Sequence, residues 1–180
     1  MGMDPSITAF GWAVLDVALP MRPIAMGCVR TEKGTAGRHV YRADDDGVRI
    51  DAIASELCIQ ARGAKAALIA AEAPAGAQSA VAAKAMGQAY AIARVVGVAL
   101  GIRVVTVQAH EPRVLLCGTK AASKADVEAA LLALYPDAVI TGIAGRVSPK
   151  PVREGAFDAL SVAHTVGLGM FGGMLRGERP

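Results

Sequence analysis

Residues 1–16 read MGMDPSITAFGWAVLD, and this stretch decides the fold. It predicts a strand, a tight turn and a second strand, with Asp4 where the first strand gives way to the turn. Pro5 cannot donate a hydrogen bond to a sheet ladder and Gly11 permits unusual backbone angles, so the ladder should be interrupted here. A carboxylate at a strand end, followed by hydroxyl side chains, can present oxygen to a metal ion or a phosphate. An acidic turn residue without such a role explains this stretch equally well.

The composition indicates one globular domain. The chain has 180 residues, of which 53% are hydrophobic and 4% aromatic, so the core must consist mainly of Ala, Val, Leu and Ile. This content argues against disorder. The net charge of +3 permits a nucleic-acid partner without requiring one. Three widely spaced cysteines without a CxxC pattern fit reduced thiols better than disulfides or a zinc site.

The sequence also predicts the location and the extent of the domain. The longest apolar run, residues 89–102, is interrupted by Arg94 and is too short to cross a bilayer. With no signal peptide expected, we predict a cytoplasmic protein that does not associate with membranes. The domain should span residues 1–168, and the glycine-rich residues 169–180 should form a flexible tail.

Apolar periodicity and turn residues predict an α/β order of elements. Strands are expected over residues 1–3, 10–17, 24–30, 66–71 and 102–107, and helices over 46–62, 79–100, 110–116, 123–134 and 153–167. The first three strands should form an antiparallel meander, and a strand, long helix and strand imply a parallel crossover. Four small residues at four-residue spacing give the long helix a narrow side that suits either a dimer interface or packing on the sheet: Ala85, Ala89, Ala93 and Gly97.

Further carboxylates are placed like Asp4 or share one helical face. Glu72 follows a continuous apolar run, which is typical of the end of a strand buried on both faces. Glu154 and Asp158 are four residues apart on the last helix, where like charges repel. Solvent and Arg153 could offset that repulsion, or a divalent metal ion could do so.

The four carboxylates Asp4, Glu72, Glu154 and Asp158 could form one site. If the first and fourth strands are neighbours, Asp4 and Glu72 emerge side by side, and a helix packed across that edge brings Asp158 to them. Oxygen-only ligands suit Mg2+ or Mn2+ rather than Zn2+. Two such ions about 4 Å apart can activate water and stabilise the leaving oxygen of a phosphodiester.

Motifs along almost the whole chain resemble those of RuvC-type Holliday junction resolvases, which belong to the ribonuclease H-like nuclease superfamily. The matching segments are GMDPSITAFGW at 2–12, Glu72, MGQA at 86–89, Cys117-Gly118 with KADV at 124–127, and DALSVA at 158–163. The chain would be a divergent or viral member. The resemblance implies a single domain with a mixed five-stranded sheet flanked by helices on both faces.

The resemblance also implies an activity and roles for residues. We expect an endonuclease that uses two Mg2+ ions, which Mn2+ can replace, and that acts as a homodimer making paired nicks across a four-way DNA junction. Asp4, Glu72 and Asp158 would bind the metal ions, and Lys124 and Arg113 would lie near the scissile phosphate. Phosphate contacts are expected from a wider basic set, although solvation explains some of these side chains equally well: Arg113, Lys120, Lys124, Arg146, Lys150 and Arg153.

Two departures from the family pattern bear on selectivity and on metal binding. Gly155 stands where the family often has Asp or His, so Glu154 is the expected fourth metal ligand. Residues 73–76 read APAG, without the bulky aromatic that wedges into the junction in many family members. This change favours a looser choice among branched DNAs.

Three alternatives to a junction resolvase remain open for the function of the chain. They are a flap or fork endonuclease, a nucleotide-binding domain of the actin and sugar-kinase type, and an inactive DNA-binding module.

Overall fold

A mixed five-stranded sheet forms the centre of the protein, as predicted. The computed structural model describes residues 1–18, 20–34, 42–136 and 150–175. Its strand order is β3-β2-β1-β4-β5. The first three strands pair antiparallel, whereas β1 with β4 and β4 with β5 pair parallel. The bounds are β1 Gly2–Asp4, β2 Ala9–Asp16, β3 Arg22–Arg30, β4 Leu68–Glu72 and β5 Arg103–Val107.

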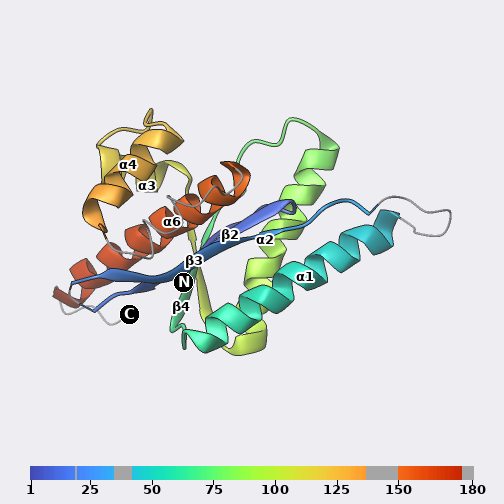
Figure 1. The fold of residues 1–180 in the computed structure, drawn as a ribbon, viewed down its shortest axis with the longest axis horizontal. Coiled ribbons are helices and arrows are strands. Elements are labelled where there is room, and N and C mark those ends of the chain that lie inside the picture. The colour runs from blue at the N-terminus through green and yellow to red at the C-terminus, as the bar shows by residue number, and fades with distance from the viewer. Residues whose placement is uncertain (19, 35–41, 137–149, 176–180) are drawn as a thin grey trace.

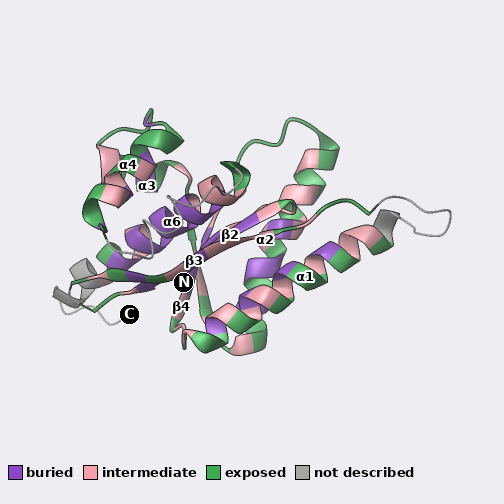
Figure 2. Ribbon diagram, in the orientation of Figure 1, coloured by how far each residue is buried: buried purple, intermediate pink, exposed green. Residues whose placement is uncertain are grey.

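Helices cover both faces of the sheet (Figure 1). On one face lie α1 (Arg42–Gly63) and α2 (Ala80–Leu100), and their apolar side chains form one cluster with Met3, Phe10 and Ile69. On the other face α6 (Lys150–Leu175) crosses the sheet, with α3 (His110–Cys117) and α4 (Lys124–Leu134) packed outside it. The buried residues of α6 lie along the side that meets the strands (Figure 2).

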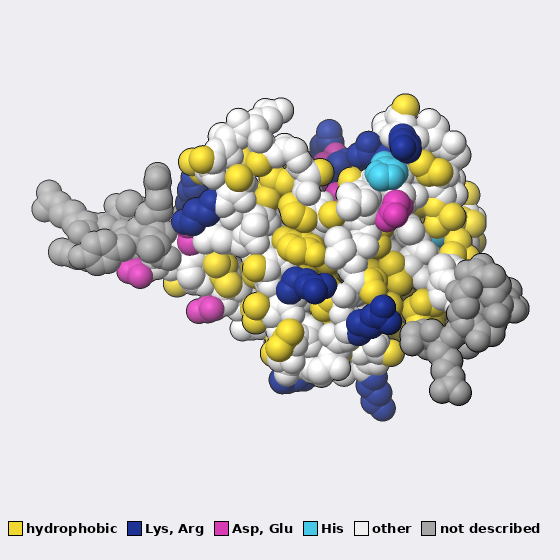
Figure 3. Space-filling view, turned by 180° about the vertical axis from the view of Figure 1, so that it is seen from behind, with side chains coloured by type: hydrophobic (Ala, Val, Ile, Leu, Met, Phe, Trp, Pro, Cys, Tyr) yellow, Lys and Arg dark blue, Asp and Glu magenta, His cyan; other side chains and the backbone are white. Residues whose placement is uncertain are grey.

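The narrow side of α2 packs on the sheet, so the dimer-interface alternative is wrong for this face. Ala89 and Ala93 are fully buried. A β-carbon added at Gly97 would lie 2.2 Å from the side chain of Val104 on β5. The exposed side of α2 instead carries valines such as Val98. Figure 3 shows apolar side chains interspersed with Lys and Arg on the surface turned away in Figure 1.

The last helix extends beyond the predicted range of 153–167 at both ends, and the boundary expected at residue 168 falls inside it. Gly167 lowers helix propensity, but a β-carbon there would lie only 3.3 Å from Met21 and Val17. Tertiary packing that requires a small residue therefore overrides the local preference. Similarly, α1 begins at Arg42 rather than at 46, with Asp44 and Asp45 in its first turn, where carboxylates favour a helix.

Other sequence predictions concern cysteines and membranes. Cys28, Cys58 and Cys117 are free thiols. Within the described ranges, no helix has both the length and the apolar character to cross a membrane.

Candidate active site

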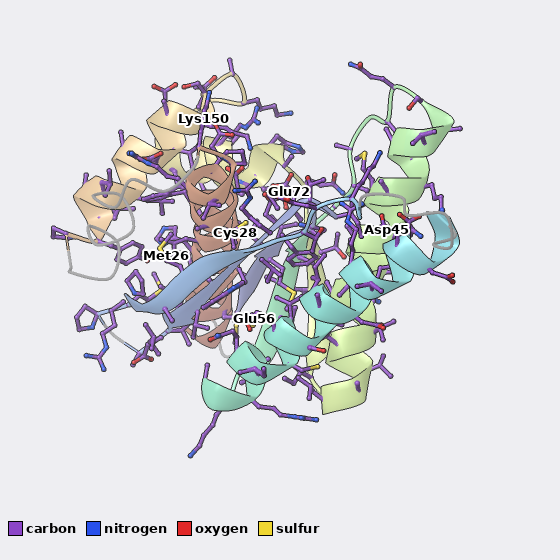
Figure 4. All side chains as sticks on the ribbon, turned by 45° about the vertical axis from the view of Figure 1, so that its right-hand side comes forward. Met26, Cys28, Asp45, Glu56, Glu72 and Lys150 are labelled. Atoms are coloured by element: carbon purple, nitrogen blue, oxygen red, sulfur yellow. The ribbon has the colours of Figure 1, made fainter. Side chains whose placement is uncertain are left out.

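Asp4 and Glu72 emerge side by side from neighbouring parallel strands. The β1–β4 register pairs Gly2 with Ala70 and Met3 with Ala71, so the next step along both strands brings Asp4 level with Glu72. Side chains alternate between the faces of a sheet, so Asp4 lies on the same face as Gly2, which contacts α6. Glu72 likewise shares the face of Ala70, which packs on α6. Figure 4 shows Glu72 at this end of the sheet, between α6 and α2.

A close contact between α6 and the sheet brings Asp158 to the two strand ends. A β-carbon on Gly2 would lie 2.0 Å from the carbonyl oxygen of Ala159, and one on Gly11 would lie 1.9 Å from that of Gly155. The absence of side chains at these positions lets the helix backbone approach the strands directly. The convergence of Asp4, Glu72 and Asp158 is as the sequence predicted.

The three carboxylates and two cations line one hollow, of about 390 Å³ including space open to solvent. Arg113 of α3 and Lys124 of α4 supply the positive charge. The remaining lining residues are Ala109, Pro112, Val127 and Ser161. Of these, Ser161 donates its hydroxyl hydrogen to the backbone oxygen of Asp158 at 2.7 Å. Its hydroxyl is therefore used in a hydrogen bond within α6.

Burial raises the pKa values of all three carboxyl groups, and repulsion by nearby carboxylates adds to this effect. Burial, followed by the charges of Asp158 and Glu72, raises the pKa of Asp4 to about 7, against the opposing effect of Lys124. The pKa of Glu72 is raised by burial and then by Asp158. Burial also raises the pKa of Asp158, although the hydrogen bond from Lys124 opposes this. The cluster thus carries more negative charge than its surroundings stabilise, and an added cation would relieve this.

Lys124 is the direct counter-ion of Asp158. Its ammonium group donates a hydrogen bond to Asp158 Oδ2. Burial lowers the pKa of Lys124, but the hydrogen bond and the charge of Asp158 outweigh this, so the pKa is raised. A capping box positions the lysine at the start of α4, with Ser123 N donating to Asp126 Oδ2 at 2.8 Å and Asp126 N donating to Ser123 Oγ at 3.2 Å.

The donor chemistry of the hollow fits Mg2+ or Mn2+, because Asp4, Glu72 and Asp158 offer only carboxylate oxygen. No group of three or more His, Cys, Asp or Glu side chains in the described part of the chain is yet arranged as a metal site. Asp158 is instead turned to the Lys124 ammonium. Reorientation of these side chains would be needed for all three to bind a common ion.

The other predicted site residues lie further from the hollow. Glu154 does not line it and forms an ion pair of 3.5 Å with Lys150. Arg153 donates from Nε to Glu128 Oε1 at 2.7 Å. Lys120 is exposed between α3 and α4. Arg146 lies outside the described residues.

Two further polar groups near the site were not singled out from the sequence. The side chain of Arg49 is buried and donates from Nη2 to the carbonyl oxygen of Ile7 at 2.9 Å and from Nε to Thr31 Oγ1 at 2.9 Å. It therefore fixes the turn that follows Asp4. Tyr90 lies close to Glu72 on the α2 side. A lone arginine or tyrosine in a helix carries no pattern that reveals such a contact.

Outside the hollow, His164 contacts Tyr135. It is buried, and its Nδ1 lies 2.6 Å from the hydroxyl of Tyr135. Burial lowers the pKa of His164.

Comparisons with known proteins identify the fold. No protein-family model matches the sequence, and no curated protein matches it. Several solved structures match, and two of them share 21% sequence identity with this chain over 95% of its length. One is T. thermophilus RuvC in complex with Holliday junction substrate, with a TM-score of 0.73 over 94% of that chain. The other is the Thermus thermophilus RuvC structure, with a TM-score of 0.70 over 95% of that chain, so the predicted ribonuclease H-like fold is confirmed.

Proposed function

We propose that this chain is an Mg2+-dependent, structure-selective endonuclease that resolves four-way and other branched DNA junctions during recombination and repair. The observation that carries the proposal is the convergence of Asp4, Glu72 and Asp158 with Lys124 and Arg113 in one hollow. The solved RuvC structure that this fold resembles is described in complex with Holliday junction substrate, which supports branched DNA as the ligand.

Each charged side chain in the hollow has a role in phosphodiester hydrolysis. Asp4, Glu72 and Asp158 would bind two Mg2+ ions, which supply Lewis-acid activation of water and charge stabilisation at the leaving oxygen. Mn2+ should replace Mg2+ because both prefer oxygen ligands. Lys124 and Arg113 bind the phosphate on the α4 side and offset the charge that develops there. Lys124 must exchange Asp158 for the phosphate when DNA binds.

The symmetry of the substrate bears on the assembly. Two strands at equivalent positions of a four-way junction must be cut to resolve it. A two-fold homodimer places two copies of the hollow in a symmetric arrangement that matches such paired cuts. The protein would recognise the shape and the phosphate backbone of the DNA more than its bases.

A direct test is cleavage of synthetic DNAs with matched sequences. End-labelled four-way junction, fork, flap and linear duplex are each incubated with the protein and Mg2+, and the products are separated on denaturing gels. We expect symmetric nicks in the junction and little cutting of the duplex. Equal cutting of all four DNAs would contradict structure selectivity, and an intact junction would contradict nuclease function.

A fork or flap endonuclease is the second candidate. The segment Ala73-Pro74-Ala75 after Glu72 carries no aromatic side chain that could wedge into the centre of a four-way junction. Under this alternative, forks and flaps are cut faster than the four-way junction in the same assay.

A further inference from the structure

A second hollow adjoins the first and shares Asp4 and Glu72 with it. It encloses about 380 Å³ including open space, and its other walls come from the segments that follow β1 and β4 and from α2. These walls are Pro5, Ala73, Pro74, Ala75, Met86 and Tyr90. The two hollows therefore meet at the carboxylate pair, with α4 and α6 beside the first and α2 beside the second.

The two hollows differ in chemistry. The first contains Arg113 and Lys124, whereas the described residues that line the second include no Lys or Arg. Met86 and Tyr90 are four residues apart on α2 and so lie on the same side of the helix. The Tyr90 hydroxyl is 2.7 Å from Thr106 Oγ1 of β5, which fixes the aromatic ring at the wall of the hollow.

We propose that this second hollow binds an unstacked nucleobase of the nucleotide next to the scissile phosphate. The inference rests on the proposed nuclease function and adds a binding subsite to it. A phosphate that binds Asp4 and Glu72 through metal ions would face the cations on the α4 side. The nucleoside bonded to that phosphate then reaches the surface on the other side of the carboxylates, which is apolar and aromatic. Aromatic rings bind bases of any sequence by stacking, because every base has a flat π-face.

The subsite accounts for selection of branched DNA without a wedging aromatic after Glu72. A base inside a continuous duplex must be unstacked before it can enter the hollow, whereas a base at a branch point is more easily extruded. Tyr90 thus becomes a specificity-determining residue, which favours DNA with a poorly stacked base beside the cut.

The test uses four-way junctions with an abasic nucleotide. After the cut phosphate is mapped on an intact junction, the base is removed on its 5′ side, on its 3′ side, or four nucleotides away as a control. Single-turnover rates in Mg2+ are measured for the wild type, for Tyr90→Leu, which removes the ring, and for Tyr90→Phe, which keeps it. Thermal melts confirm that each variant is folded.

The proposal predicts a specific pattern of rates. Loss of one flanking base slows the wild type about tenfold, and loss of the distant base does not. Tyr90→Leu cuts the intact junction about tenfold more slowly and shows no further loss on the abasic one, while Tyr90→Phe behaves like the wild type. Equal wild-type rates on intact and both flanking-abasic junctions would overturn the subsite and leave the nuclease function standing, even if Tyr90→Leu does not fold. If the wild type cuts no branched DNA, the nuclease function fails and the subsite fails with it.

Discussion

Gly11 of β2 and Gly155 of α6 touch backbone to backbone. A β-carbon on Gly11 would lie 1.9 Å from the carbonyl oxygen of Gly155, and one on Gly155 would lie 3.3 Å from the carbonyl oxygen of Ala9. This contact sets the height of α6 above the sheet and hence the position of Asp158. A side chain at Gly155 would therefore require the backbone near Ala9 to give by a few tenths of an ångström.

Gly11→Ala should lower the free energy of unfolding by about 3 kcal/mol or more, because the new methyl group meets backbone that cannot move aside. Gly87→Ala is the matched control, since a β-carbon at this exposed helical position meets nothing within 4 Å. That control should stabilise the protein by about 0.5–1 kcal/mol. Chemical denaturation measures both, and equal stabilities for the two variants would refute the close contact.

Asp4→Asn should stabilise the metal-free protein at pH 8, raising its melting temperature by about 5 °C. The folded-state pKa of Asp4, about 7, is above its ordinary value of 3.8, so its contribution to stability is lost as the pH rises from about 4 to 7. The difference in melting temperature between Asp4→Asn and the wild type should therefore be smaller at pH 5 than at pH 8. Asp51→Asn, at an exposed position on α1, is the control and should change little. Added Mg2+ should raise the melting temperature of the wild type more than that of Asp4→Asn, because it binds the native carboxylates.

Glu72→Gln should reduce the rate of junction cleavage at least about 100-fold. Even loss of a residue that only hydrogen-bonds to a metal ligand typically lowers metal affinity or activity about 10–100-fold. Junction binding, measured by mobility shift in Ca2+, should remain, because the change removes negative charge rather than a DNA contact. Glu56→Gln is the control, at a half-buried position on α1 where the carboxylate accepts a hydrogen bond from Gln60 at 2.8 Å. A Glu72→Gln protein that cuts at the wild-type rate would exclude Glu72 from the chemistry.

Lys124→Ala should slow cleavage and reduce the slope of log binding constant against log salt concentration by about 1, because one phosphate contact is lost. Arg103→Ala is the control, since Arg103 is exposed at the start of β5, whereas Glu72 pairs with Val107 at its other end. Equal salt slopes for the wild type and Lys124→Ala would argue against a phosphate contact at this lysine.

The convergence of Asp4, Glu72 and Asp158 could be predicted because it depends on strand order and side-chain alternation. Side-chain alternation and a buried strand that ends in a carboxylate follow from local patterns. The pairing of β1 with β4 was a condition of the prediction, and the strand order meets that condition. The position of Lys124 in the hollow followed from the family resemblance, not from spacing.

Other features depend on tertiary contacts that local patterns do not encode. The continuation of α6 through Gly167 depends on Met21 and Val17, which approach from a distant hairpin. The contact of Arg153 with Glu128 could not be distinguished from a phosphate contact, because both require the same exposed guanidinium. Likewise Tyr90, in the middle of an alanine-rich helix, gave no sign that it would lie beside Glu72.

The order of the segments along the chain has a consequence for synthesis. Asp4 and Glu72 leave the ribosome early, but Asp158 lies on α6. The contact of α6 with Gly2 and Gly11 forms only after that helix has been made. A nascent chain therefore holds two of the three carboxylates without the element that completes the set. Under the proposed function, the carboxylate set that would bind the metal ions is therefore complete only after α6 has been translated.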